Sequence, residues 1–282
     1  MGHDHEDRLS QLPETIINQI LSYLPEKQVP QIYLLSKTFL QFMATRSTLY
    51  LRLTDDVKIR KKIDAILERY NQERLAITKF KLIVMTTLED KNIIASTYRW
   101  LDIVINNMHL QEIELLIATS KNNNYNVPIG IFSLKNLRSL WITGINKSVS
   151  LSCDACQFDK QISGLRSLRT MRFHDLKIVS WLLKKLISNC VNIENLFLNR
   201  LDSPGLEKIE VHELEKINKL HIRFCEGLKD IDIENAPNLE SVKVVYYSNT
   251  TRPNIRILGA EKLTDVTIDE INNIFHVAPL IW

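Results

Sequence analysis

A six-residue pattern of large apolar residues recurs through the second half of the chain and constrains the fold more than any other feature. The pattern L-x-x-L-x-L, in which isoleucine, valine, methionine or phenylalanine replaces some leucines, begins at residues 137, 168, 193, 217, 239 and 263. The last four copies begin 24, 22 and 24 residues apart, a period typical of repeats that stack into a solenoid. A single repeat cannot bury its apolar side alone, whereas a stack forms a continuous core. We therefore predict a solenoid of short parallel strands.

A second apolar pattern lies between the main copies. Residues 206–211 carry L-x-x-I-x-V, and residues 228–233 carry L-x-x-I-x-I, 22 positions later. A glycine precedes each copy, at Gly205 and Gly227, where a tight turn favours a residue without a side chain. The C-terminal repeats are therefore expected to contribute two short strands each and no helix.

The first part of the chain has a more helical character. No glycine occurs between Gly2 and Gly130, and apolar residues recur at helical spacing in two segments. We expect helices over 55–74 and near 96–107, and strands over 80–85 and 113–117.

Composition bounds the class of protein. The chain has 282 residues, enough for one small and one medium domain, and 45% of them are hydrophobic. Its net charge of +3 is too small to indicate a nucleic-acid partner. The start MGHDHEDR lacks a signal-peptide pattern, and no uninterrupted apolar run approaches the length of a membrane span. We therefore expect a protein of the nucleus or cytoplasm, with no membrane partner.

The sequence contains no recognisable catalytic or metal-binding motif. It has no G-x-S-x-G, no H-E-x-x-H and no phosphate-binding loop pattern. Cys153 and Cys156 form a single C-x-x-C pair without the second pair that a zinc site requires. We expect no enzyme activity, no cofactor and no metal, so function should lie in binding surfaces.

Residues 8–46 form a short and unusually apolar unit, RLSQLPETIINQILSYLPEKQVPQIYLLSKTFLQFMATR. Pro13 suits the first turn of a helix, and the apolar residues from Ile16 to Leu24 recur at helical spacing. Three short helices are expected: the first ends at Pro25, the second holds Pro30 in its first turn, and Ser36 is a plausible N-cap for the third. Such a unit has more apolar surface than it can bury by itself, so it predicts a binding partner.

This segment resembles the F-box, the helical module that docks a substrate receptor onto the Skp-type adaptor of a cullin–RING ubiquitin ligase. The resemblance rests on four groups of residues: Leu12-Pro13-Glu14, Ile16-Ile17, the run from Ile20 to Pro25, and Leu35-Ser36-Lys37. It implies that one apolar helix face contacts the adaptor. The residues expected to make that contact are Leu12, Pro13, Ile17, Ile20, Leu21 and Pro25.

The remainder of the chain is similar to the plant F-box/leucine-rich-repeat (LRR) family, and many members of that family continue into a further C-terminal domain. The similarity rests on WLDIVI at 100–105, QEIEL at 111–115, PIGIFSLKNLRSL at 128–140 and ISNCVNIENL at 187–196. It implies an α+β repeat protein and a short member of the family. We expect a three-helix F-box over residues 8–50, a linker helix over 51–75 and an LRR solenoid over 76–282. The implied role is that of a non-catalytic substrate receptor in an SCF-type (Skp–cullin–F-box) ubiquitin ligase.

The outward side chains of the main strands are candidates for target binding. Residues that alternate with core leucines in a strand point to the opposite side of the sheet. On the main strands they include Trp141, Arg172, His174, Phe197, His221 and Arg223, an aromatic and basic set. The second strands present Glu207, Glu210, Asp230, Asp232 and Glu234, so the other face is predicted to be acidic. A simpler interpretation is that these charges only keep the sheet soluble.

Two alternatives stay open on the sequence alone. Phe39 and Thr38 stand where the F-box family has tryptophan and arginine, which would suit an LRR interaction scaffold whose degenerate F-box has no ligase role. The basic cluster from Lys58 to Lys62 would suit a nucleic-acid-binding repeat protein, although the low net charge argues against it.

Overall fold

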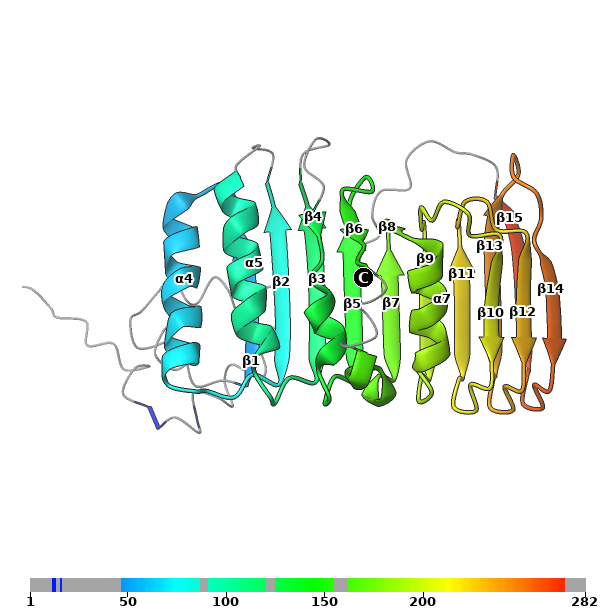
Figure 1. Cartoon of the computed structure of the whole chain (residues 1–282), viewed down its shortest axis with the longest axis horizontal. Helices are drawn as coiled ribbons and strands as arrows, with labels where there is room; N and C mark the ends of the chain where they lie inside the picture. Colours follow the sequence, from blue (N-terminus) through cyan, green and yellow to red (C-terminus); the bar gives the residue numbers. More distant parts are fainter. Residues whose placement is uncertain are drawn as a thin grey trace, which may run out of the picture.

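A computed structural model describes residues 12, 13, 16, 47–86, 91–119, 125–154 and 162–271. Within this part of the chain the dominant element is one nine-stranded sheet (Figure 1). Every pair of neighbouring strands in it is parallel. In spatial order the strands are β1 (Thr48–Leu53), β2 (Lys79–Met85), β3 (Glu112–Ala118), β5 (Ser139–Gly144), β7 (Thr170–His174), β9 (Asn195–Asn199), β11 (Lys219–Arg223), β13 (Ser241–Tyr247) and β15 (Asp265–Ile271).

A second layer covers one face of this sheet (Figure 1). Its helices are α4 (Val57–Gln72), α5 (Lys91–Ile105) and α7 (Ser180–Asn189), with 3₁₀ turns η1 (Ile129–Ser133) and η2 (Ile162–Ser167). Its strands form two three-stranded parallel sheets: β4 (Tyr125–Asn126), β6 (Val149–Leu151) and β8 (Leu176–Ile178), then β10 (Lys208–His212), β12 (Asp230–Glu234) and β14 (Asn254–Leu258).

The second layer of the first repeats differs from that of the last repeats. The first main strands, β1 to β3, begin 31 and 33 residues apart, whereas β9 to β15 begin 24, 22 and 24 residues apart. A longer connection leaves room for a helix, while the shorter one holds only a turn and a five-residue strand. The predicted solenoid of parallel strands is therefore confirmed, as is the expectation that the last repeats have two strands and no helix.

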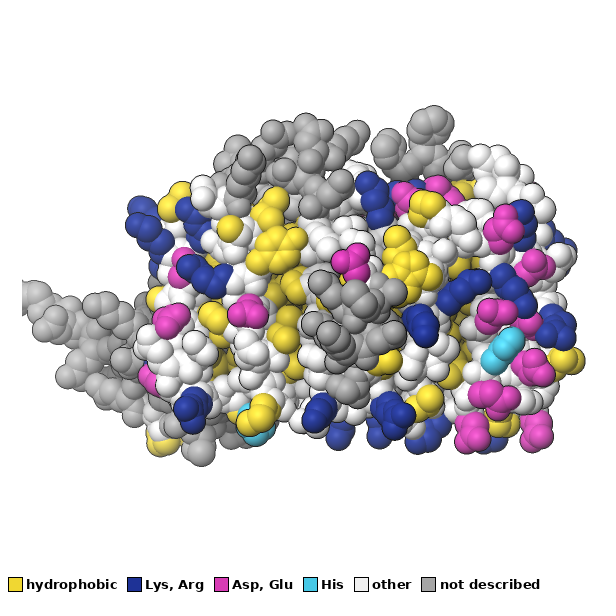
Figure 2. All heavy atoms as spheres, viewed as in Figure 1, with side chains coloured by type: hydrophobic (Ala, Val, Ile, Leu, Met, Phe, Trp, Pro, Cys, Tyr) yellow, Lys and Arg dark blue, Asp and Glu magenta, His cyan; other side chains and the backbone are white. Residues whose placement is uncertain are grey.

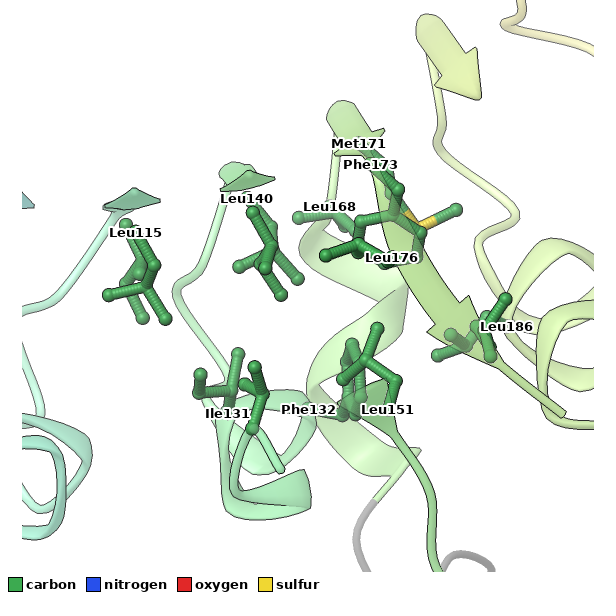
Figure 3. Packing of buried hydrophobic residues seen from close by; sticks show 14 of the residues in the cluster. Leu115, Ile131, Phe132, Leu140, Leu151, Leu168, Met171, Phe173, Leu176 and Leu186 are labelled. Carbon is green, nitrogen blue, oxygen red and sulfur yellow. The ribbon is translucent and has the colours of Figure 1, made fainter. Parts of the chain in front are cut away.

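The core lies between the two layers. The inward residues of the repeated pattern are almost completely buried, with Leu196 and Leu220 both 0% exposed. Figure 3 shows Leu115 and Leu140 of the main sheet facing Ile131 and Phe132 of the second layer. A solenoid stacked in this way has one continuous core, because each repeat contacts its neighbours.

The main sheet begins earlier in the chain than residue 76, the residue at which the sequence predicts the repeat domain to start. Strand β1 pairs with β2 along its whole length. Helix α4, expected as a linker, packs against α5, and the indole Nε1 of Trp100 donates to Asp64 Oδ1 at 2.7 Å. Residues 51–75 thus supply the end of a strand and the helix of the first repeat. The difference arises because β1 carries only one short alternation, TLYLRL, and Arg46 stands where the six-residue pattern would begin with an apolar residue.

Asparagine side chains connect several repeats at the turns before the main strands. Asn192 Nδ2 donates to the carbonyl of Arg166 in the preceding repeat at 2.6 Å. Asn238 Nδ2 donates to the carbonyl of Glu215 at 2.7 Å, and its Oδ1 accepts from Lys262 Nζ at 2.7 Å. Both asparagines immediately precede the first residue of the apolar pattern, so this position holds successive repeats in register.

The predicted F-box lies almost entirely outside the described residues. Leu12 is partly buried and Pro13 is exposed, and the Pro13 carbonyl accepts a hydrogen bond from the Ile16 backbone N–H at 2.9 Å. Ile17, Ile20, Leu21 and Pro25 are among the residues that the structure does not describe. None of the described helices is long and apolar enough to cross a membrane.

Candidate functional site

The outer face of the main sheet carries all six residues predicted to bind a target. Register pairing places Trp141, Arg172, Phe197 and His221 in one row across β5, β7, β9 and β11. The adjacent row on these strands is Thr143, His174, Asn199 and Arg223. Their outward side chains are partly exposed while the inward ones are buried. We call these two rows the central face. The structure brings its residues together, and their role in binding stays a prediction.

The first row is a series of stacked side chains. The Arg172 guanidinium lies 5.2 Å from the Trp141 ring centre and 4.4 Å from that of Phe197. The Phe197 ring in turn meets the His221 ring edge to face at 4.8 Å. Aromatic faces attract a cation through their quadrupole, so Arg172 is held between two rings. This leaves the N–H edges of its guanidinium as the groups that a ligand can reach.

The histidines of the central face are neutral near pH 7. Burial lowers the pKa of His174, and the nearby Arg200 and Arg223 lower it further against the opposing effect of Asp175. Burial also lowers the pKa of His221, with Lys243 and Lys219 acting in the same direction. Asn199 Nδ2 lies 2.8 Å from Nδ1 of His174, so a neutral imidazole can accept that bond. The positive charge of this face therefore comes from its arginines.

Arg172 and Arg223 lack an acidic partner in the part of the chain that the structure describes. Among the described residues, neither Arg172 nor Arg223 has a carboxylate within ion-pair distance. The buried Nε of Arg223 also finds no hydrogen-bond acceptor in the described part of the chain. By contrast, Lys81 pairs with Glu114 at 2.9 Å on one side of the central face, and Lys243 pairs with Asp269 at 3.8 Å on the other.

The second layer has a different charge pattern from the one predicted. Its three-stranded sheet β10–β12–β14 is not simply acidic, because Asp232 is 4% exposed and is surrounded by cations. Arg256 donates to both Asp232 carboxylate oxygens, at 2.7 and 2.8 Å, and Lys208 lies 3.0 Å away. Figure 2 shows basic and acidic side chains interleaved over these strands. The prediction of an acidic face is wrong because it counted carboxylates without their partners on neighbouring strands.

The described residues hold no metal site and no reactive thiol. No group of three or more potential metal ligands occurs among them. Burial raises the pKa of Cys190 and of Cys225 to about 12, so both thiols stay protonated and poorly nucleophilic. A crevice of about 130 Å³ beside Cys225 and Pro253 is smaller than the roughly 300–1,000 Å³ of typical small-molecule pockets.

Comparison with known proteins finds a matching repeat-domain family and several similar plant proteins. Residues 66–279 match the family model described as "At1g61320/AtMIF1, LRR domain". Similar curated proteins include the FBD-associated F-box protein At5g22730 of Arabidopsis thaliana, 26% identical over 237 residues that cover 80% of this chain and 46% of that protein. The F-box/FBD/LRR-repeat protein At5g56420 of the same plant is 25% identical over 260 residues, covering 86% of this chain and 56% of that protein.

A third Arabidopsis thaliana protein, F-box/LRR-repeat protein At3g26922, is 24% identical over 294 residues, which cover 96% of this chain and 85% of that protein. The chain spans about half the length of the first two relatives. No solved structure matches the chain.

Proposed function

Because the chain belongs to the At1g61320/AtMIF1 LRR domain family and is similar to plant F-box/LRR proteins, we propose that it is the substrate-recognition subunit of an SCF-type ubiquitin ligase. The F-box would bind a Skp-type adaptor and, through it, a cullin–RING ligase. The LRR sheet would bind the protein to be ubiquitinated. The observation that carries the proposal is that one chain has both an F-box sequence pattern and a repeat sheet whose central face has arginines without a carboxylate partner among the described residues.

The adaptor surface is proposed from the sequence pattern of residues 12–25. The expected contacts are apolar, from Leu12, Pro13, Ile17, Ile20, Leu21 and Pro25, and they match the helix-in-groove mode of recognition. A few central aliphatic side chains usually carry most of the energy in such an interface. The exposed Pro13 and partly exposed Leu12 are accessible for it.

The chain would promote ubiquitin transfer by proximity and not by its own chemistry. Holding a target beside the ligase raises the effective concentration of its lysines near the charged conjugating subunit. Such a role needs two independent binding surfaces and no catalytic residue. It also places the protein in the nucleus or cytoplasm.

Co-purification with a Skp-type adaptor tests the proposal. The Leu21→Asp variant should lose the adaptor, because a charge would be buried unpaired in an apolar interface. Arg223→Ala is the matched control and should keep it, because Arg223 lies on the central face. A folded wild-type chain that recovers no adaptor would overturn the ligase role. It would favour the alternative, an LRR scaffold with a degenerate F-box, to which Phe39 and Thr38 point.

A further inference from the structure

We propose that the central face binds an extended acidic segment of the target protein, with aspartate or glutamate side chains about three residues apart. The inference rests on the proposed function, since it names the class of target that the receptor selects. The partner chemistry is a set of separate carboxylates and not a single phosphate group.

Charge complementarity is the first argument. The twelve outward residues of β5, β7, β9 and β11 include Arg172, Lys219 and Arg223 but no aspartate or glutamate. On one side of this group Glu112 and Glu114 of β3 pair with lysines of β2, and on the other side Asp269 of β15 pairs with Lys243 of β13. A group of several cations without a carboxylate among them therefore lies at the centre of the sheet. An acidic ligand would supply the carboxylates that the face itself lacks.

The spacing of the arginines sets the spacing of the ligand's charges. Arg172 lies on β7 and Arg223 on β11, with β9 between them. Neighbouring strands lie about 4.8 Å apart, and Arg223 lies two residues further along its strand than His221, the register partner in the Arg172 row, so the two Cα atoms are separated by roughly 12 Å. An extended peptide in the polyproline II conformation has about three residues per turn and advances about 3.1 Å per residue, so side chains at positions i and i+3 project from the same side about 9 Å apart. The long glutamate and arginine side chains span the remaining distance, so carboxylates at positions i and i+3 would reach both arginines.

Aromatic contacts keep the two guanidinium groups apart. Arg172 is held between Trp141 and Phe197, and the Arg223 guanidinium lies 5.6 Å from the Phe224 ring centre. Groups fixed on separate rings do not converge on one anion, which disfavours a single phosphate as the ligand. The partly exposed Trp141 and Phe197 rings also offer apolar surface to the residues between the carboxylates.

The experiment measures peptide binding to the full chain by fluorescence anisotropy. The probe is a fluorescein-labelled peptide of sequence ESTESTESTEST, and the reference peptide replaces each glutamate with glutamine. We expect the glutamate peptide to bind at least tenfold more tightly in 50 mM NaCl. Arg172→Ala and Arg223→Ala should each weaken binding about tenfold. Lys229→Ala, the control, removes the same charge from a lysine that pairs with Glu207 in the second layer at 2.7 Å, and should leave affinity unchanged.

Several results would overturn the inference. Equal binding of the glutamate and glutamine peptides would do so, as would arginine variants that match Lys229→Ala. Tighter binding of a glutamine peptide with one phosphoserine, or of an oligothymidine of equal length, would reject separate carboxylates as the ligand. Thermal unfolding of each variant verifies that it is folded. Adaptor co-purification from the same preparations separates the two proposals, because it depends on the F-box and not on the central face.

Discussion

Two valines in matching positions of neighbouring strands offer a test of where the core of the solenoid ends. Val242 of β13 and Val266 of β15 are register partners. Val242 is 0% exposed, whereas Val266 is 48% exposed at the last main strand described. Replacing either with alanine removes the same two methyl groups from the same kind of site, so the comparison isolates burial.

The structure sets the expected magnitudes. Two fully buried methyl groups contribute about 1.6 kcal/mol of transfer free energy at roughly 0.8 kcal/mol each, and the cavity left behind adds to this loss. Val242→Ala should therefore lower the free energy of unfolding by about 2–3 kcal/mol. Val266 already keeps half of its surface in water, so Val266→Ala should cost less than about 1 kcal/mol.

Urea unfolding of both variants in parallel with the wild type measures these values, from the shift in midpoint at unchanged slope. A Val266→Ala cost equal to that of Val242→Ala would refute the reasoning. It would mean that Val266 is covered in the folded protein and that the core continues past β15.

Three further predictions concern turns, repeat register and charge. Gly164→Ala should lower the free energy of unfolding in urea by about 1–3 kcal/mol, because the added Cβ would lie 2.5 Å from the Leu134 carbonyl oxygen. Gly130→Ala is the neutral control, because its Cβ would meet nothing nearer than 3.6 Å. Equal losses of stability in the two variants would contradict this packing. Asn238→Ala removes two inter-repeat hydrogen bonds. Each bond contributes about 1 kcal/mol, so the melting temperature should fall by several degrees. An unchanged melting temperature would show that these bonds do not hold the register. The Arg256 guanidinium, with help from Lys208, lowers the pKa of Asp232, so the stability gained from this carboxylate is present above about pH 4 and is lost as the pH falls through its folded pKa. The difference in melting temperature between wild type and Asp232→Asn should shrink as the pH falls from about 4 to 2, and a difference that stays constant from pH 7 to pH 2 would contradict this origin.

The sequence predicts the repeat architecture because its signal is periodic and local. The copies at 193, 217, 239 and 263 correspond to the main strands β9, β11, β13 and β15. Alternation within each strand then places Arg172 and Arg223 on the outer face. The resemblance to plant F-box/LRR proteins is confirmed by the family and by its Arabidopsis relatives.

Features that depend on pairing between distant residues could not be read from the sequence. Strand β1 joins the sheet through its register with β2, and no repeat signal marks it. Asp232 looked like one more surface carboxylate, because its partner Arg256 lies 24 residues later. The sandwich of Arg172 between Trp141 and Phe197 likewise needs the register of three strands. The short helix α7 was not predicted, because it lies before the repeats in which a second apolar pattern was identified.

The most direct test of a substrate receptor is whether one chain bridges adaptor and ligand. Purified Skp-type adaptor is passed over beads carrying the ESTESTESTEST peptide, with and without the chain. We predict that the adaptor is retained only when the wild-type chain is present. Leu21→Asp should leave the chain on the beads without adaptor, and Arg172→Ala should release both. A chain that is retained by the peptide but never brings the adaptor with it would contradict the account.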